Sequence, residues 1–171
     1  EVEAAGRWPD AILAVLDGFP LSGLDLPESL GGVEAGSLAK MAVLETIAQY
    51  DASGLAGADR IGPTVGALVA CPDRALAAEV AASCLAGTAQ SALTVIDPEL
   101  GSGGLDWAPG WPALRWIWAM EGDTLRLHEV TGATEPIIAL AFQASGGVRV
   151  GFDRTTVRGS WELSHRSALE V

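Results

Sequence analysis

The feature that most constrains this chain is a change of sequence pattern near residue 92. Residues 1 to about 92 are rich in Ala and Leu and place apolar residues at helical spacing. The remainder alternates apolar and polar residues and carries five of the six tryptophans. We therefore predict an α+β fold with two parts. An N-terminal helical lobe over 1–92 is followed by an antiparallel β-barrel or β-sandwich lobe over 93–171.

Pro and Gly residues divide the first part into helices, since Pro is tolerated in a first helical turn and Gly ends helices. The expected helices run from Pro9 to Gly18, from Pro63 to near Cys71, and from Pro72 to Gly87. Another begins at Ser37, a potential N-cap. Its apolar residues form a wide face, which predicts a helix covered on more than one side. They are Leu38, Met41, Leu44 and Ala48, with Val43, Ile47 and Tyr50 beside them.

Strands are expected wherever β-branched or alternating segments lie between turn signals. The expected strands are Leu93–Ile96, Leu114–Met120, Leu125–His128, a doubly buried Ile137–Phe142, Val148–Phe152 and a final pair over Thr155–Val171. The Gly- and Pro-rich segment from Gly101 to Pro112 is expected to form a loop, and Gly122-Asp123 and Gly146-Gly147 are expected to form turns.

The charge balance excludes two classes of partner. The net charge is −12, from 22 acidic and 10 basic residues, and Lys40 is the single lysine. Such a surface repels nucleic acid and anionic lipid, so we expect neither as a partner.

No apolar run approaches the roughly 20 residues of a membrane-spanning helix. Cys71 and Cys84 form no CxxC or metal-binding pattern, which predicts free thiols, no metal and a cytoplasmic location.

Several chemically able side chains have an ordinary structural interpretation beside a functional one. The glycines at 101, 103 and 104 precede no helix, which argues against a dinucleotide-binding loop. Asp97 and Glu99 could form an acid–base pair, although a solvated loop is the simpler interpretation. His128 and His165 are expected on polar, exposed strand faces. The tryptophans at 107, 111, 116 and 118 could stack on a planar ligand, with core packing as the default.

The order of several short motifs carries more information than any one of them. An aromatic-Pro pair in Gly6–Pro9 is followed by Gly18, Gly23-Leu24 and the loop Pro27–Gly32, which reads PESLGG. The stretch Leu44–Ser53 ends in DAS, and Leu93–Gly103 reads LTVIDPELGSG. Gly122–Leu125 and Val157–Leu163, VRGSWEL, complete the series. In this order the motifs resemble the acyl-CoA dehydrogenase family along nearly the whole chain, from about Gly6 to Val171.

The resemblance implies an FAD-dependent α,β-dehydrogenation of an acyl-CoA or similar thioester, with the lobes as the family's N-terminal helical and middle β domains. It assigns Val95, Ile96, Asp97, Gly101, Ser102 and Thr131 to cofactor binding. Ile96 stands where the family has a flavin-facing Thr, and Glu129-Val130-Thr131 stands at its Trp-Ile-Thr strand.

The family's catalytic glutamate lies in a C-terminal helical domain, which the sequence does not reach. We therefore assign no catalytic residue and expect a second acyl-CoA dehydrogenase-like chain, or a missing domain, to complete the site. The alternative is that the chain is a degenerate, non-catalytic subunit of a hetero-oligomer, or a binding module, without flavin.

Overall fold

A computed structural model describes residues 21–51, 58–96, 104–108, 114–137 and 147–163. The described helices are α3 (Ser37–Asp51), α5 (Val65–Ala70) and α6 (Arg74–Leu85), with short 3₁₀ turns η1 (Leu21–Gly23), η2 (Glu28–Leu30) and η3 (Gly62–Thr64). The strands are β1 (Gln90–Val95), β2 (Gly104–Ala108), β3 (Leu114–Glu121), β4 (Thr124–Val130), β5 (Glu135–Ile137), β6 (Gly147–Gly151) and β7 (Thr155–Glu162), with the 3₁₀ turn η5 (Phe152–Arg154) before β7.

The strands form two sheets, which confirms the α+β class but corrects two details of the prediction. One sheet has the order β1-β3-β4-β7 and the other β2-β6-β5. The first sheet is mixed, because β1 runs parallel to β3 while the other pairs are antiparallel. A parallel neighbour needs a crossover rather than a hairpin, and alternation alone does not distinguish the two arrangements. The described strands do not close into a barrel.

The four-stranded sheet lies between the helices and the second sheet. Trp116, Trp118 and Leu127 face α6 and pack against residues such as Val80 and Cys84 in one buried cluster. On the other face, Ile117 packs with Leu114, Ala92 and Val150, the last from β6. Helices and strands therefore share a core. Strand β1 begins at Gln90, slightly before the predicted boundary between the two lobes at residue 92.

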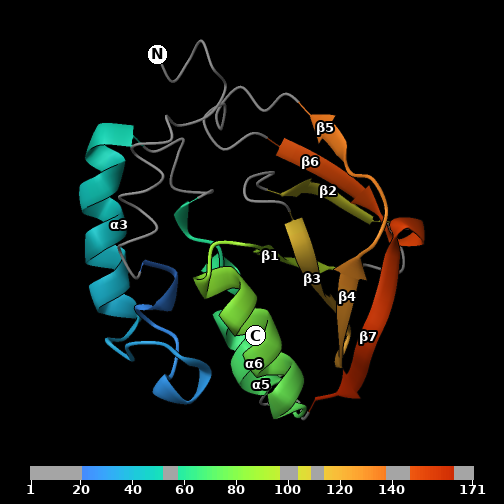
Figure 1. The fold of residues 1–171 in the computed structure, drawn as a ribbon, viewed down its shortest axis with the longest axis horizontal. Coiled ribbons are helices and arrows are strands. Elements are labelled where there is room, and N and C mark those ends of the chain that lie inside the picture. The colour runs from blue at the N-terminus through green and yellow to red at the C-terminus, as the bar shows by residue number, and fades with distance from the viewer. Residues whose placement is uncertain (1–20, 52–57, 97–103, 109–113, 138–146, 164–171) are drawn as a thin grey trace.

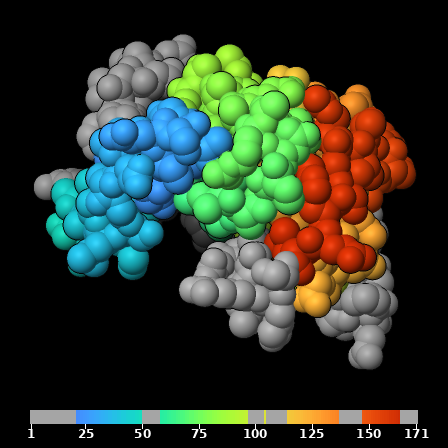
Figure 2. All heavy atoms as spheres, turned by 90° about the horizontal axis from the view of Figure 1, so that it is seen from below, coloured from blue at the N-terminus to red at the C-terminus, as the bar shows by residue number. Residues whose placement is uncertain are grey.

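Helix α3 stands apart from this stack, with α5 and α6 between it and the sheets (Figures 1 and 2). Its inner side packs through Val43, Leu44 and Ile47 against Leu21 and Ala58. The outer residues of the predicted wide face are exposed, so the expectation of cover on more than one side is wrong for the part of the chain that the structure describes.

The helix boundaries that Pro and Gly predicted are confirmed for α5 and α6. Pro63 lies in η3, directly before α5, and α5 ends at Ala70, beside Cys71. Asp73 caps α6, because its carboxylate accepts a hydrogen bond from the N–H of Leu76 at 3.0 Å. The helix predicted over 9–18 lies outside the described residues.

The backbone of the loop Pro27–Gly32 requires glycine at both of its paired positions. Gly31 has φ +84°, a conformation that disfavours side chains. A Cβ atom on Gly32 would lie 1.9 Å from the carbonyl oxygen of Leu26. The chain returns close to itself here, since the N–H of Glu34 donates to that same carbonyl at 3.0 Å. The sequence prediction of a loop is confirmed, with the short turn η2 inside it.

Among the strands, three predictions need correction or fall outside the description. The segment predicted as a loop from Gly101 to Pro112 contains β2, which pairs with β6. The end of the predicted strand Val148–Phe152 is wrong, since Phe152 opens η5. Most of the strand predicted over 137–142, and the last part of the pair predicted over 155–171, lie outside the described residues, whereas β7 accounts for the first part of that pair.

Candidate functional site

The segment that the resemblance assigns to a flavin begins at the end of β1, an edge strand of its sheet. The N–H of Ile96 donates to the carbonyl oxygen of Met120 on β3 at 2.7 Å, whereas the N–H of Ser91 donates away from β3, to the carbonyl oxygen of Arg60 at 2.9 Å. Main-chain N–H groups alternate in direction along a strand, so the N–H of Val95 points away from β3 like that of Ser91. This edge can therefore offer hydrogen bonds to a bound group.

The two side chains at this edge point to opposite faces of the sheet. Val95 is in register with Met120, on the face toward the helices, and is 72% exposed. Ile96 shares the face of Ala92, which packs toward Val150 of the second sheet, and is half-buried. An exposed valine and a hydroxyl-free isoleucine leave the main chain as the main source of hydrogen bonds here. Asp97, Gly101 and Ser102 lie outside the described residues.

Thr131 lies at the opposite end of the same sheet. The end of β1 is in register with Met120, and Met120 is in register with Leu125 at the start of β4. Thr131 follows six residues later, which at about 3.3 Å per residue places it about 20 Å away along the sheet. Its hydroxyl donates to the carbonyl oxygen of Arg154 at 3.4 Å. The structure therefore does not bring Thr131 together with Val95 and Ile96.

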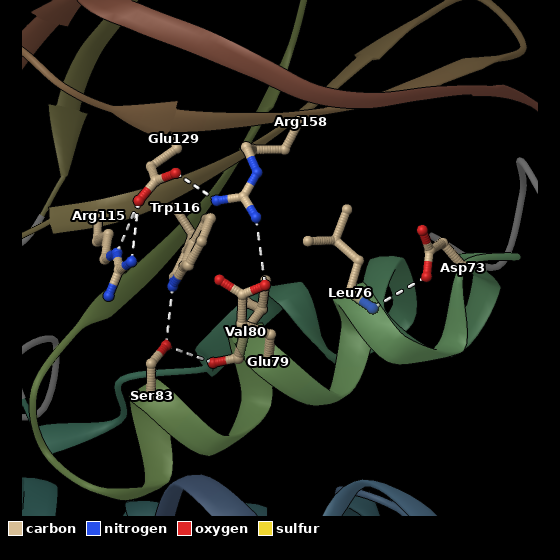
Figure 3. Close-up of polar contacts among 9 residues, drawn as sticks. All are labelled: Asp73, Leu76, Glu79, Val80, Ser83, Arg115, Trp116, Glu129 and Arg158. Carbon is tan, nitrogen blue, oxygen red and sulfur yellow. Dashed lines mark hydrogen bonds and ion pairs between the residues drawn. The ribbon is translucent and has the colours of Figure 1, made fainter.

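Glu129, near Thr131, is the centre of a polar cluster (Figure 3). Register places it beside Trp116, on the face toward the helices. Its carboxylate accepts hydrogen bonds from Arg115 at 2.9 and 3.1 Å, and a further one from Arg158. Arg158 also pairs with Glu79 of α6 at 3.2 Å. An unpaired carboxylate against a bound ligand would carry a desolvation cost. Here two guanidinium groups pair with the Glu129 carboxylate and neutralise its charge.

Trp116 ties this polar cluster to α6. Its indole Nε1 donates to the Ser83 hydroxyl at 2.8 Å, and that hydroxyl donates to the carbonyl of Val80 at 2.8 Å. The guanidinium carbons of Arg115 and Arg158 lie 4.7 and 5.6 Å from the ring centroid of Trp116. These are cation–π distances. Trp116 is therefore a core residue with a polar end, which agrees with the default interpretation for this tryptophan, whereas the side chains of Trp107 and Trp111 lie outside the description.

The electrostatics of the cluster argue against Glu129 as a general base. Partial burial acts to raise the pKa of Glu129, but hydrogen bonds from Arg158 and Arg115 outweigh it and hold the pKa below its ordinary value. The hydrogen bond to Glu129 correspondingly raises the pKa of Arg158. A carboxylate with a lowered pKa and three donors is a weak proton acceptor. The arrangement fits a clamp between β3, β4, β7 and α6.

The prediction for His128 is wrong. The side chain is buried between the sheets, where its ring centroid lies 4.6 Å from that of Phe152. Nδ1 lies 2.9 Å from the hydroxyl of Thr155, and no described residue forms a hydrogen bond with Nε2. Burial, together with the charge of Arg126, lowers the pKa of His128. The error arose because β4 is covered on both faces, which its alternating sequence does not reveal.

The two cysteines are buried and free, as predicted. Burial raises the pKa of Cys84 to about 12 and also raises that of Cys71. Neither sulfur is therefore an activated nucleophile. The described ranges contain no group of three or more His, Cys, Asp or Glu side chains able to hold a metal. They also contain no helix that could cross a membrane.

A buried ionic triad at α3 is a feature that the sequence reasoning missed. Lys40 Nζ lies 2.9 Å from Asp25 Oδ1 and 2.8 Å from Asp59 Oδ2, with all three side chains largely buried. The signal available in the sequence was the single lysine, placed in an apolar helix. Its two partners are 15 and 19 residues away along the chain, so no local pattern identifies them.

Comparison with known proteins gives a fold likeness. The sequence matches no protein-family model, and no curated protein matches it. A solved structure that resembles it is that of a nitrososynthase from Micromonospora carbonacea var. africana. The two share 21% sequence identity with a TM-score of 0.60, over 91% of this chain and 47% of the nitrososynthase. The chain thus spans about half the length of that protein, and at this identity the likeness concerns the fold alone.

Proposed function

We propose that the chain is part of a flavin-dependent acyl-CoA dehydrogenase, completed by another chain or domain. The observation that carries the proposal is the edge of β1 at Val95, with which no described strand pairs. This is where the motif order places the flavin segment, and it directs main-chain groups outward. The order of a helical part, a strand and a β part along nearly the whole chain gives further support.

The described end of β1 fits the polar edge of a flavin ring. Such an edge carries ring carbonyls and an N–H, which main-chain groups can match without a special side chain. The Val95 N–H points away from β3, so it is available to a ring bound at this edge. The exposed Val95 side chain provides apolar surface beside it. Thr131 is excluded from the same ring contact by its distance. FAD would supply hydride acceptance when bound, and this chain would orient it.

Three of the described carboxylates are held by cations and are poor proton acceptors. Glu129 is held by Arg115 and Arg158, and Asp25 and Asp59 are held by Lys40. Abstraction of the α-proton of an acyl thioester needs a carboxylate within hydrogen-bond reach of that carbon. The resemblance places the base in a C-terminal helical domain, so we infer that the base comes from a second acyl-CoA dehydrogenase-like chain or a further domain, with the thioester bound between the two.

A second candidate function is a non-catalytic subunit or binding module without flavin. Ile96 favours it, because a hydroxyl is lost at the position where the family has a flavin-facing Thr. The clamp at Glu129 also favours it, since the strand end that would reach a flavin instead fixes α6 to the sheet.

FAD uptake separates the two candidates. We expect the purified chain, mixed with its complementary chain, to bind FAD with a shift in the visible flavin spectrum. Val95→Pro removes the outward N–H and should abolish uptake, whereas Val95→Ala keeps the N–H and should retain it. Circular dichroism of both variants checks the fold. A complex that never takes up FAD, or one whose uptake survives Val95→Pro, would contradict the flavin proposal.

A further inference from the structure

Helix α3 carries an exposed apolar stripe. Leu38 is 84% exposed and Met41 is 64% exposed. With Ala42 and Ala48 they line an open hollow of about 540 Å³, bounded by Leu44 and Glu45. Large apolar side chains exposed side by side on a helix typically mark an interaction surface.

The stripe cannot turn inward, because the opposite side of α3 is fixed. Val43 and Ile47 pack against Leu21 and Ala58. Lys40 is held between Asp25 and Asp59 at 2.9 and 2.8 Å. Rotation of the helix to bury Leu38 would break both ion pairs, which are largely buried and costly to separate. The exposure is therefore a fixed property of the helix.

The charges around the stripe are of one sign. Residues 21–51 contain five acidic residues and one basic residue, Lys40, which is buried. Glu34 is exposed beside the start of α3, and Glu45 is exposed within the stripe itself, between Met41 and Ala48. An occupant of the stripe therefore meets apolar surface with negative charge at its centre and near one end.

We propose that this face of α3 binds an amphipathic helix of a partner polypeptide, with Lys or Arg beside its apolar stripe and one of these opposite Glu45. A helix laid against an apolar helix face is a common recognition mode. A second copy of this chain is disfavoured, since it would bring together two faces with the same negative charge in a chain of net charge −12. The proposal rests on α3 alone and does not depend on flavin binding.

Two stapled helical peptides of 15 residues, the length of α3, provide the probes. Both have the same Leu and Ala stripe, flanked by Lys in one peptide and by Glu in the other. Fluorescence anisotropy with the full chain measures their affinities. We expect the Lys peptide to bind at least about ten-fold more tightly than the Glu peptide. Glu45→Lys should narrow or reverse that preference.

The decisive variant is Leu38→Asp with Met41→Asp, which makes the chain more acidic. General attraction between a basic peptide and an acidic protein would then increase, whereas docking on the stripe should weaken by at least about ten-fold. Val69→Asp with Val157→Asp adds the same two negative charges at exposed valines outside α3 and should leave binding intact.

Three results would overturn the proposal. One is binding of neither peptide, and another is a Lys-peptide affinity that Leu38→Asp with Met41→Asp leaves unchanged. The third is a dimer, seen in sedimentation, that this double substitution dissociates, because the occupant would then be a second copy. FAD uptake is measured separately, so failure here leaves the proposed function standing.

Discussion

Helices α3 and α6 are built from similar Ala- and Leu-rich sequence, yet α6 buries its large apolar side chains, whereas α3 is covered on one side and leaves Leu38 and Met41 exposed. Leu76 and Val80 of α6 pack against the four-stranded sheet, and Leu76 is 8% exposed. Leu38 of α3, in a comparable sequence, is 84% exposed. Apolar periodicity thus shows that a helix has a face to cover, but does not show what covers it.

The two helices also differ in what attaches them to the rest of the molecule. The face of α6 is buried, and Glu79 and Ser83 add polar contacts to the sheet on its margin. For α3, a small apolar cluster and the buried triad of Lys40 provide the attachment among the described residues. Packing dominates in one region and charge pairing has a large part in the other, which makes the comparison testable.

The largest effect is expected for Lys40→Met. The substitution leaves Asp25 and Asp59 close together and largely buried without a cation, so we expect a loss of about 3–5 kcal/mol of unfolding free energy. Urea denaturation followed by circular dichroism measures it. Arg154→Met, at an exposed pair with Asp153, should change the free energy by less than about 0.5 kcal/mol. A loss at Lys40 no larger than at Arg154 would show that packing alone holds α3.

Adding Asp25→Asn and Asp59→Asn to Lys40→Met tests the cause of the loss. The neutral triple variant has no buried charge to compensate, so most of the lost stability should return. If it does not, the lysine stem acts by packing rather than by pairing.

A matched pair of leucines tests the difference in cover directly. Leu76→Ala removes a buried side chain from the face of α6 and should cost about 2–4 kcal/mol. Leu38→Ala removes the same atoms from an exposed position and should lie within about 0.5 kcal/mol of the original chain. The urea midpoints of both variants provide the measurement. Similar losses would mean that Leu38 is covered in solution.

The sequence was most informative where a local rule sets the structure. The helix starts near Pro63 and Pro72, the paired glycines after Pro27 and the turn at Gly122 each follow from chemistry within a few residues. The parallel pairing of β1 with β3, the strand β2 and the burial of His128 depend on neighbours distant along the chain, and local patterns do not encode them.

The same contrast applies to the candidate site. The motif order assigned the end of β1 to the candidate site, and no described strand pairs with the edge of β1 at Val95. It did not reveal that Thr131 lies at the far end of the sheet, because that separation depends on strand register. Nor did it reveal the partners of Glu129, since Arg158 is 29 residues away along the chain.

A smaller effect is expected for Glu129→Gln, which loosens the polar contacts of α6. Arg115 and Arg158 are partly exposed, so solvent screens the pairs, and we expect a loss of about 1 kcal/mol at pH 7. The folded-state pKa of Glu129 is lowered, so its stabilisation is present above the ordinary carboxyl pKa and disappears as the pH falls through the folded value. Urea titrations should show the stability difference between the two chains shrinking as the pH falls from 7 to 3. A difference of the same size at both pH values would indicate a packing role.

The smallest effect concerns the other face of the same sheet, at His128. Its folded-state pKa is lowered, so the unfolded chain binds a proton more readily. Stability should therefore be complete above the ordinary histidine pKa and should decline as the pH falls through it. His128→Gln should flatten this dependence between pH 7 and pH 5. Urea midpoints across this range measure the effect. An unchanged slope in His128→Gln would contradict a pKa of His128 lowered by its burial between the sheets, in contrast to the exposed face of α3.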